Sequence, residues 1–261
     1  MLLVLDIGNT NIKFGVFKGE ELMASWRVST EAAKTADEYG MLLGDLLRTQ
    51  GLTFKDIDSV IMSSVAPSLN YTIEHMCRYY LGLSPIVVDS DSNCGLKITY
   101  DHPKDLGPDR IVGSTAAFHL YGGPVILIDF GSATTFNAIT ADGEFLGGAI
   151  APGIKTATES LVNVAAKLPR IELVRPEKVV CTNTKSCMQA GIIYGYTGLV
   201  EFMIKKIKET PGMENAKVVA TGGLSQLVQY DGDNKLIDIV DRALALKGLK
   251  IIFDRQKTET L

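Results

Sequence analysis

The sequence predicts an α/β protein made of two related domains, each with a mixed β-sheet and packed helices. Three observations predict this fold class. A strand–turn–strand pattern at the amino terminus returns near the middle of the chain, a second kind of apolar strand follows each copy, and segments of strand and helix length alternate throughout. With 261 residues, the chain is long enough for two ordinary domains.

The repeat is clearest at the amino terminus. Residues 2–17 align without a gap on residues 125–140, so that Asp6 falls on Asp129. Each copy has an apolar strand, an Asp-x-Gly turn and a second apolar strand, which is typical of a β-hairpin with a glycine at its tight turn. We interpret the repeat as a duplicated domain; chance similarity between two glycine-containing hairpins is the alternative.

A weaker internal similarity relates residues 59–64 to residues 217–222. Both are apolar runs that end in small residues before a predicted helix. Other apolar patterns predict strands over residues 24–29 and 86–88, and helices over residues 36–50, 70–81, 109–120, 157–166, 186–209 and 238–246. We expect an N-terminal domain of residues 1–118 and a C-terminal domain of residues 119–254, which face each other across a cleft.

Composition excludes several classes of partner. The net charge of −4 gives no electrostatic reason to expect nucleic acid, and no basic amphipathic or long apolar segment suggests a membrane. The start has no positively charged signal region, so we expect a cytoplasmic protein. The four cysteines have no CxxC spacing, and we expect structural thiols rather than a zinc site: Cys77, Cys94, Cys181 and Cys187.

The turn Asp6–Asn11 combines a carboxylate, a glycine, amides and a hydroxyl. Backbone N–H groups and polar side chains around such a turn can hold phosphate oxygens, and a carboxylate there implies a divalent cation. Lys13 supplies a positive charge nearby. A plain hairpin turn is the alternative, but the second copy at Asp129–Thr135 favours the nucleotide interpretation. The chain contains neither GxxxxGK[ST] nor GxGxxG, so a nucleotide would bind through paired hairpins.

Two further segments bear on the chemistry. Asp109 and Arg110 open a predicted helix, where Asp109 can be an N-cap or a proton acceptor beside an anion-binding arginine. A helix amino terminus predicts a lowered pKa for this Asp109 carboxyl. The segment Ala220–Ser225 has two glycines between a strand and a helix, which suit either a nucleotide's sugar and base or tight packing alone.

Taken together, these segments closely resemble type III pantothenate kinases, which belong to the superfamily of acetate and sugar kinases, Hsp70 and actin. The resemblance covers nearly the whole chain in order, through Leu5–Asn11, Thr35–Gly40, Ser63–Pro67, Gly107–Arg110, Asp129–Thr135, Gly147–Gly153, Leu168–Arg170, Asn183–Thr184, Gln189–Gly191 and Ala220–Gly223. It implies two ribonuclease H-like domains of the actin and Hsp70 type. It also implies ATP-dependent phosphorylation of pantothenate to 4'-phosphopantothenate, the first step of coenzyme A biosynthesis.

The resemblance also implies roles for individual residues. Phosphates of ATP and Mg²⁺ are expected at Asp6, Gly8, Asn9, Thr10, Asn11 and Lys13, with Ser132 also reaching ATP. Asp109 is expected to be the general base, and pantothenate to be held by Tyr100, Gly107, Pro108, Asp109, Arg110 and Thr184. Asp129 is expected to bind a monovalent cation, K⁺ or NH₄⁺. A homodimer is usual in the family, with pantothenate partly against the neighbouring subunit.

Two positions depart from the family pattern. Ser132 stands where Thr is usual and keeps the hydroxyl, and Pro108 stands where Ala is common and leaves the neighbouring Asp109 side chain unaffected. Two alternatives remain at this point: another small-molecule kinase or phosphatase of the same superfamily, and a regulator or scaffold with a kinase-like fold. A degenerate regulator should have lost Asp6, Asp109 or Arg110, and this chain keeps all three.

Overall fold

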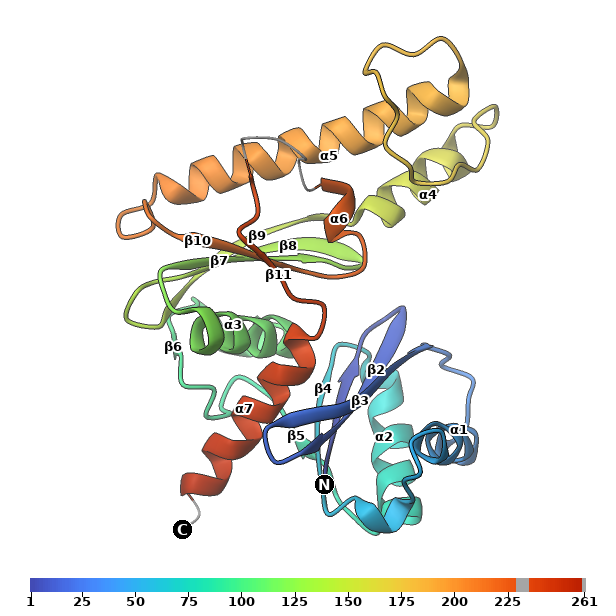
Figure 1. Cartoon of the computed structure of the whole chain (residues 1–261), viewed down its shortest axis with the longest axis vertical. Helices are drawn as coiled ribbons and strands as arrows, with labels where there is room; N and C mark the ends of the chain where they lie inside the picture. Colours follow the sequence, from blue (N-terminus) through green and yellow to red (C-terminus); the bar gives the residue numbers. More distant parts are fainter. Residues whose placement is uncertain (229–234, 260–261) are drawn as a thin grey trace. The chain divides into compact units, whose positions relative to one another are not determined.

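The computed structural model describes residues 1–228 and 235–259, which form two compact units (Figure 1). The first unit comprises Met1–Leu96, Asp101–Ala116 and Leu244–Leu261, and the second comprises Lys97–Tyr100 and Ala117–Ala243. The chain leaves the first unit close to the expected boundary at residue 118. Residues 244–254, expected in the C-terminal domain, instead return to the first unit.

The first unit contains a five-stranded sheet in the order β3-β2-β1-β4-β5. Its strands are β1 (Leu2–Ile7), β2 (Asn11–Lys18), β3 (Glu21–Ser29), β4 (Ser59–Ser64) and β5 (Ile86–Val87). The strands β1, β2 and β3 are antiparallel neighbours, whereas β4 pairs in parallel with β1, as expected for a mixed sheet. The predicted hairpin over residues 2–17 is therefore confirmed.

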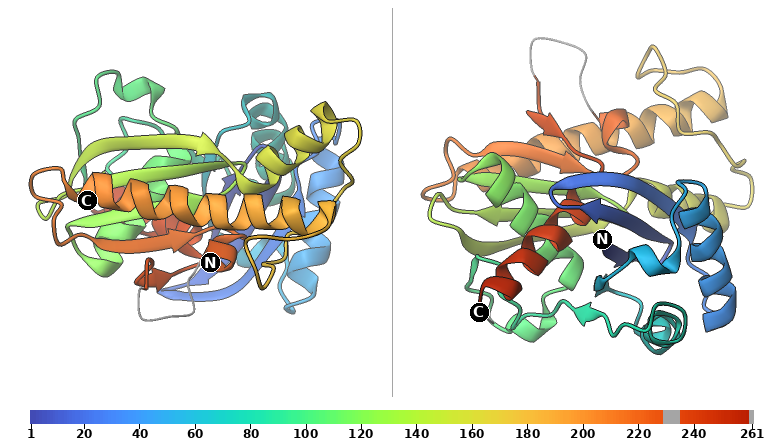
Figure 2. Two further views of the ribbon diagram at one scale, coloured as in Figure 1. Left: turned by 90° about the horizontal axis from the view of Figure 1, so that it is seen from above. Right: turned by 60° about the horizontal axis from the view of Figure 1, so that its bottom comes forward.

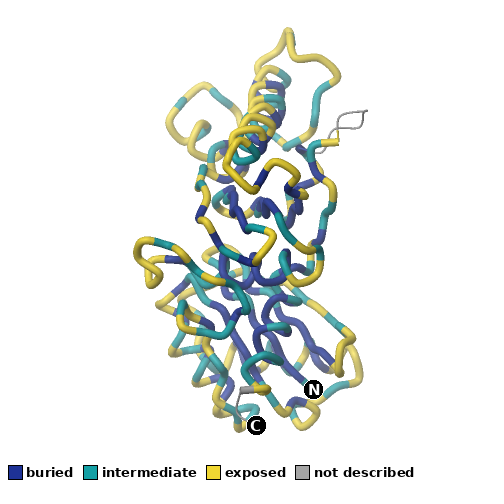
Figure 3. Tube along the Cα trace, turned by 90° about the vertical axis from the view of Figure 1, so that its left-hand side faces the viewer, coloured by how far each residue is buried: buried dark blue, intermediate teal, exposed yellow. Residues whose placement is uncertain are grey.

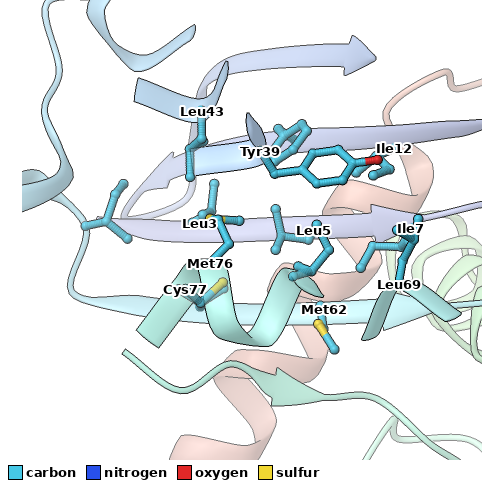
Figure 4. Packing of buried hydrophobic residues seen from close by; sticks show 14 of the residues in the cluster. Leu3, Leu5, Ile7, Ile12, Tyr39, Leu43, Met62, Leu69, Met76 and Cys77 are labelled. Carbon is cyan, nitrogen blue, oxygen red and sulfur yellow. The ribbon is translucent and has the colours of Figure 1, made fainter. Parts of the chain in front are cut away.

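One face of this sheet is covered by α1 (Ala36–Arg48) and α2 (Pro67–Met76), which is continued by a π-helical turn, Cys77–Leu81. A capping box fixes the start of α1, because the Thr35 hydroxyl accepts the Glu38 N–H while the Glu38 carboxylate accepts the Thr35 N–H. Figure 4 shows Tyr39 and Leu43 of α1 packed over Leu3 and Leu5 of β1. This apolar layer holds β1, and hence the turn that follows it, in place.

The helix α7 (Leu244–Glu259) packs on the same sheet and contacts β1, β2 and β4. The predicted helix over residues 238–246 is wrong, because the chain there forms the short strand β11 (Ile239–Val240) before α7 begins. Periodicity cannot separate so short an apolar run from a helix. Gly248 lies within α7, and a side chain at this position would overlap the Val112 carbonyl, so the glycine permits close packing.

The second unit contains a six-stranded sheet in the order β11-β10-β7-β8-β9-β6. Its remaining strands are β6 (Lys97–Ile98), β7 (Val125–Phe130), β8 (Ala133–Ile139), β9 (Glu144–Pro152) and β10 (Lys217–Thr221). Among the described residues, the remaining helices are α3 (Pro108–Tyr121), most of which belongs to the first unit, and α4 (Ile154–Val164), α5 (Thr184–Lys208) and α6 (Ser225–Val228) of the second, with 3₁₀ turns at Phe54–Asp56 and Pro103–Asp105. Figure 2 shows the long helix α5 running across this sheet, and its apolar residues share a core with β7, β8 and β10.

The duplication extends to sheet topology. In the second unit, β9-β8-β7-β10-β11 repeats the order β3-β2-β1-β4-β5, and each second strand has a register shift, at Val16/Phe17 and at Ala138/Ile139. Figure 3 colours the trace by burial, and β1 and β7 have the same mostly buried pattern. The gapless alignment of the two hairpins is wrong beyond the turn, because the second turn is one residue shorter: Asp6 pairs with Lys13, but Asp129 pairs with Thr135.

Within the residues that the structure describes, no helix combines the length and apolar character needed to cross a membrane.

Candidate active site

The turn between β1 and β2 is closed by backbone hydrogen bonds. The N–H of Gly8 donates to the carbonyl of Asn11 at 3.0 Å. Thr30, just beyond β3, adds two bonds: its N–H donates to the Thr10 carbonyl at 3.0 Å, and its hydroxyl donates to the Gly8 carbonyl at 2.6 Å. Asn9 and Thr10 are exposed at the tip. The turn is thus a fixed loop whose tip can meet a ligand.

Asp6 lies at the end of β1 between polar partners on both neighbouring strands. Lys13 is its partner on β2, and Ser63 is its partner on β4. The Nζ atom of Lys13 lies 3.0 Å from Oδ2 of Asp6, and the Ser63 hydroxyl donates to Oδ1 at 3.1 Å. Asp6 is only 13% exposed in its side chain, so the ion pair is poorly screened by water. Both carboxylate oxygens are therefore oriented by the protein.

Asp109 is the second residue of α3, after Pro108 at the first helical position, where proline is favoured. Its Oδ1 atom accepts the N–H of Arg110 at 2.9 Å. A side chain at Gly107 would overlap that same oxygen, so the glycine leaves room for the carboxylate. Because Asp109 lies inside the helix and not before it, the N-cap interpretation is wrong.

Burial raises the pKa of the Asp109 carboxyl above its ordinary value, and the nearby Asp6 carboxylate raises it further. The backbone N–H and the charge of Arg110 act in the opposite direction. The lowered pKa expected for a helix amino terminus is therefore wrong, because desolvation and a like charge outweigh the N-terminal effect. Asp109 is a stronger base than an exposed aspartate, which suits proton transfer.

In the second unit, Asp129 ends β7 as Asp6 ends β1, and the two strands have the same burial pattern. The following turn closes through the Gly131 N–H, which donates to the Ala133 carbonyl at 3.0 Å. The Ser132 carbonyl accepts the Gly153 N–H at 3.0 Å and the Thr156 hydroxyl at 2.7 Å. Gly153 thus supports this turn as Thr30 supports the first, while Ser132 itself is exposed.

The surroundings of Asp129 differ from those of Asp6 in one charge. Thr135 on β8 and Thr221 on β10 are its partners, where Asp6 has Lys13 and Ser63. Thr221 is 4% exposed, and its hydroxyl has no hydrogen-bond partner among the described residues. The second hairpin therefore has hydroxyl groups in register with its carboxylate and no lysine.

Gly222 shows why the glycine pair after β10 is needed. Its φ is +92°, and a Cβ atom there would lie 2.5 Å from the Phe130 carbonyl and 2.8 Å from Oδ1 of Asp129. Such a position admits only glycine without strain. Two interpretations of this segment are open from the sequence: nucleotide binding or tight packing alone. For Gly222, the contacts with β7 explain the glycine by tight packing.

The residues expected to hold pantothenate fall in both units. Gly107, Pro108, Asp109 and Arg110 belong to the first, and Arg110 is 7% exposed. Tyr100 belongs to the second, with its ring centroid 6.2 Å from that of Phe145. Thr184 is the first residue of α5, after Asn183, whose side chain caps the helix by accepting the Ser186 N–H. The structure thus groups Asp6, Lys13 and Asp109 in one unit, and Asp129 and Ser132 in the other.

Three residues of these sites escaped prediction as site residues: Ser63, Thr30 and Thr221. The weaker similarity between residues 59–64 and 217–222 indicated Ser63 and Thr221, because it placed the ends of β4 and β10 at equivalent positions. Only the strand register shows that these ends lie beside Asp6 and Asp129. Thr30 could have been found from the hairpin alone, as the first residue after the third strand.

Within residues 1–228 and 235–259, no three His, Cys, Asp or Glu side chains gather as a protein-only metal cage. Magnesium in phosphoryl-transfer sites needs only one or two carboxylates, since substrate phosphates and water complete its coordination. The partly buried carboxylate of Asp6, beside the exposed tip of the turn, fits that requirement.

Comparisons with known proteins agree with this architecture. A family model described as type III pantothenate kinase matches residues 2–206. A conserved Baf family protein of Campylobacter jejuni, described as a transcriptional activator, is 20% identical, with a TM-score of 0.62 over 98% of this chain and 99% of that chain. A ROK hexokinase from Thermus thermophilus is 11% identical, with a TM-score of 0.52 over 98% of this chain and 99% of that chain.

Component A of (R)-2-hydroxyglutaryl-CoA dehydratase from Acidaminococcus fermentans is 13% identical, with a TM-score of 0.53 over 99% of this chain and 98% of that chain. At such identities these likenesses concern the fold alone. The predicted α/β fold with two ribonuclease H-like domains and mixed sheets is confirmed.

Proposed function

Because the chain belongs to the type III pantothenate kinase family, we propose that it phosphorylates the terminal hydroxyl of pantothenate with ATP. The product is 4'-phosphopantothenate, and the reaction is the first step toward coenzyme A. The observation that carries the proposal beyond the family is the placement of Asp109, a carboxylate of raised pKa, near the Asp6 turn. A phosphate-binding turn and a general base are the two parts that phosphoryl transfer to an alcohol needs.

The Asp6 turn is the proposed site for the ATP phosphates. Asn9, Thr10 and Asn11 would donate to phosphate oxygens, Gly8 would let the phosphate approach the backbone closely, and Lys13 would add its charge. Magnesium bound near Asp6 would neutralise charge on the transferred phosphoryl group. Ser132 at the tip of the second turn would add its hydroxyl. Support comes from the closed, exposed turns and from the oriented carboxylate of Asp6.

Asp109 would accept the proton from the attacking hydroxyl of pantothenate. Its raised pKa strengthens it as a base. Arg110, Gly107 and Pro108 would position the substrate beside it, and Tyr100 and Thr184 are proposed as further contacts of pantothenate. Phosphoryl transfer asks mainly for positioning and electrostatic stabilisation, which such a set can provide.

Asp129 is the proposed site of a monovalent cation, K⁺ or NH₄⁺. The two copies of the hairpin support this assignment by comparison. Beside Asp6, the Lys13 ammonium supplies a positive charge 3.0 Å from the carboxylate, whereas the equivalent position beside Asp129 is Thr135. A monovalent cation near the Asp129 carboxylate could take oxygen ligands from this site, and the buried Thr221 hydroxyl suits an oxygen ligand.

We further propose that the protein works as a homodimer in the cytoplasm. The resemblance to the family motivates this proposal, and the exposed Leu161 and Val164 on α4, Val164 to 84%, are candidate contacts for a partner. A second copy of the chain is the expected partner. Light scattering on the purified protein should give the mass of a dimer.

The family makes the chain a kinase, so the alternative left for experiment is a different acceptor. Another small-molecule kinase of the superfamily would release ADP with that acceptor, whereas the regulator considered from the sequence would release none. The fold shared with the Campylobacter protein does not favour regulation, because this superfold hosts many activities. Retention of Asp6, Asp109 and Arg110 favours an enzyme.

The deciding experiment is an assay of ADP release with saturating MgATP, with and without pantothenate, in potassium and in sodium. We expect ADP release that depends on pantothenate and is stimulated by potassium. No such release under saturating conditions would refute the pantothenate kinase proposal. A panel of sugars and short-chain acids in the same assay would identify a different acceptor.

A further inference from the structure

Two of the four thiols lie together where the chain enters α5. The Sγ atom of Cys187, in the first turns of the helix, donates to the carbonyl of Cys181 at 3.2 Å. The Sγ atom of Cys181 donates to the Lys178 carbonyl at 3.1 Å. Cys187 is exposed and Cys181 is half-buried. Both thiols are free and within reach of solvent, and the Cys187 thiol contacts the main chain of Cys181.

The other two thiols are chemically protected. Cys77 and Cys94 are each no more than 2% exposed. Burial raises the pKa of the Cys77 thiol to about 12, so almost no reactive thiolate forms there at neutral pH. Oxidants in solution can therefore reach Cys181 and Cys187 but not the buried pair. Cys77 and Cys94 therefore serve as unreactive controls for the oxidation of Cys181 and Cys187.

The position of this pair in the helix start explains their proximity. Asn183 is the N-cap of α5, so Cys181 lies two residues before the cap and Cys187 lies in the helix, at the fourth position. A side chain at the fourth helical position faces back toward the incoming chain, as in the hydrophobic staple. A link between the two residues would close a small ring that contains Asn183 and Thr184.

We propose that Cys181 and Cys187 form a reversible disulfide when the protein meets a hydroperoxide, and that this bridge weakens pantothenate binding at Thr184. The second part rests on the proposed function. Cys187, the more exposed thiol, attacks hydrogen peroxide, the simplest hydroperoxide, as thiolate; the O–O bond breaks, a sulfenic acid forms and water leaves. The Cys181 thiolate then attacks that sulfur, the S–O bond breaks, and a second water leaves. Two thiols are oxidised by two electrons in total, and one peroxide is reduced.

The bridge has a structural cost at the helix start. Cys181 must leave its hydrogen bond to Lys178, and the main chain must shift to bring the two sulfurs into bonding distance. The Asn183 cap, whose side chain accepts the Ser186 N–H at 2.9 Å, lies inside the new ring. Thr184 follows this cap directly, so its hydroxyl would move from the position that suits the substrate. Intracellular disulfides are usually transient and regulatory, which fits such a switch.

The disulfide can be detected by mass spectrometry, without any assay of activity. The full-length protein is treated with a small excess of hydrogen peroxide, the remaining thiols are alkylated, and the protein is digested with trypsin. Cleavage after Lys185 separates the two cysteines, so the bridge links peptides 179–185 and 186–205. We expect this linked species, lighter than its two parts by two hydrogen atoms and absent after reduction. Its absence would overturn the proposal.

Single variants Cys181→Ser and Cys187→Ser are the matched controls. Neither can close the ring, so neither should lose two hydrogen atoms, whereas Cys77→Ser should still form the bridge. Loss of two hydrogen atoms in both single variants would also overturn the proposal, since another pair would then be responsible.

The effect of the bridge on pantothenate binding is tested on the same samples. We expect oxidation to raise the pantothenate KM roughly tenfold, with the KM for ATP unchanged and recovery after a dithiol reductant. The Cys187→Ser enzyme should keep its KM through the same treatment. An unchanged KM in the bridged enzyme would overturn the switch. If no pantothenate-dependent activity exists at all, the proposed function fails, while the mass measurement still decides the bridge.

Discussion

The hydroxyl of Ser63 donates to Oδ1 of Asp6 at 3.1 Å, across two strands that are 57 residues apart in the chain. Ser63 is 1% exposed, so this bond is shielded from water. Lys13 holds the other oxygen of the same carboxylate. Ser63 is therefore a positioning residue that fixes the direction in which Asp6 presents its charge.

Ser63→Ala should lower kcat about tenfold, because a buried hydrogen bond to a charged group is typically worth more than a neutral one. The magnesium concentration for half-maximal activity should also rise. Both are measured by ADP release at varied magnesium. Ser63→Thr keeps a hydroxyl and should restore most of the activity.

Ser59→Ala on the same strand is the matched control. Its hydroxyl donates to Asp58 at the far end of β4, so activity should be unchanged. Wild-type magnesium dependence in a folded Ser63→Ala enzyme would contradict the positioning role.

Replacement of Asp109 by Asn should nearly abolish turnover, because the amide cannot accept the substrate proton. In the wild-type enzyme, kcat/KM should fall as the pH drops through the raised pKa of Asp109, above its ordinary 3.8. Asp105→Asn, three residues before α3, is the control and should retain activity. Near-normal turnover in Asp109→Asn would remove the assignment of the base.

The same substitution should increase stability at neutral pH. Because folding raises the pKa of Asp109, the folded state binds more protons than the unfolded state between the two pKa values. The free energy of unfolding therefore falls as pH rises through this window, and the ionised carboxylate remains a cost above it. Asp109→Asn should have a higher Tm than the wild type at pH 7, with the difference shrinking below about pH 4. A lower Tm at pH 7 would contradict this origin of the pKa shift.

Much of the fold could be predicted because it depends on local patterns. The hairpins at Asp6 and Asp129 follow from alternating strands and a glycine turn, and the long helix α5 follows from its apolar spacing. The assignment of α7 to the first unit could not be predicted, since its partners β1 and β4 lie in the first quarter of the chain. The predicted direction of the Asp109 pKa was wrong for a similar reason. Desolvation depends on what packs around a residue, and a helix position alone does not contain that information.

Gly248 offers a test of the contact that returns α7 to the first unit. A side chain there would overlap the carbonyl of Val112 on α3, so Gly248→Ala should lower the free energy of unfolding by about 1–3 kcal/mol. Gly195 on α5 is exposed with open space around it, so Gly195→Ala should stabilise the protein by roughly 0.5–1 kcal/mol. Chemical denaturation measures both. Equal shifts of the same sign would contradict the close packing at Gly248.

The pairing of Asp6 with Lys13, and of Asp129 with Thr135, makes the cation assignment testable by one substitution. Thr135→Lys would place an ammonium group beside Asp129, as Lys13 places one beside Asp6. We expect this variant to be active in sodium alone, with little further stimulation by potassium, because the side chain supplies the charge that the free ion otherwise provides. ADP release in sodium and in potassium measures the effect.

Thr135→Val is the matched control, because it removes the hydroxyl without adding a charge. It should keep the potassium requirement with a weaker apparent affinity for the ion. Asp129→Ala should lose the stimulation by potassium, since the carboxylate that attracts the cation is gone. A folded Thr135→Lys enzyme that still needs potassium at the wild-type concentration would show that the two hairpins do not use equivalent positions for their positive charges. The monovalent site would then have to be sought away from the β7–β8 turn.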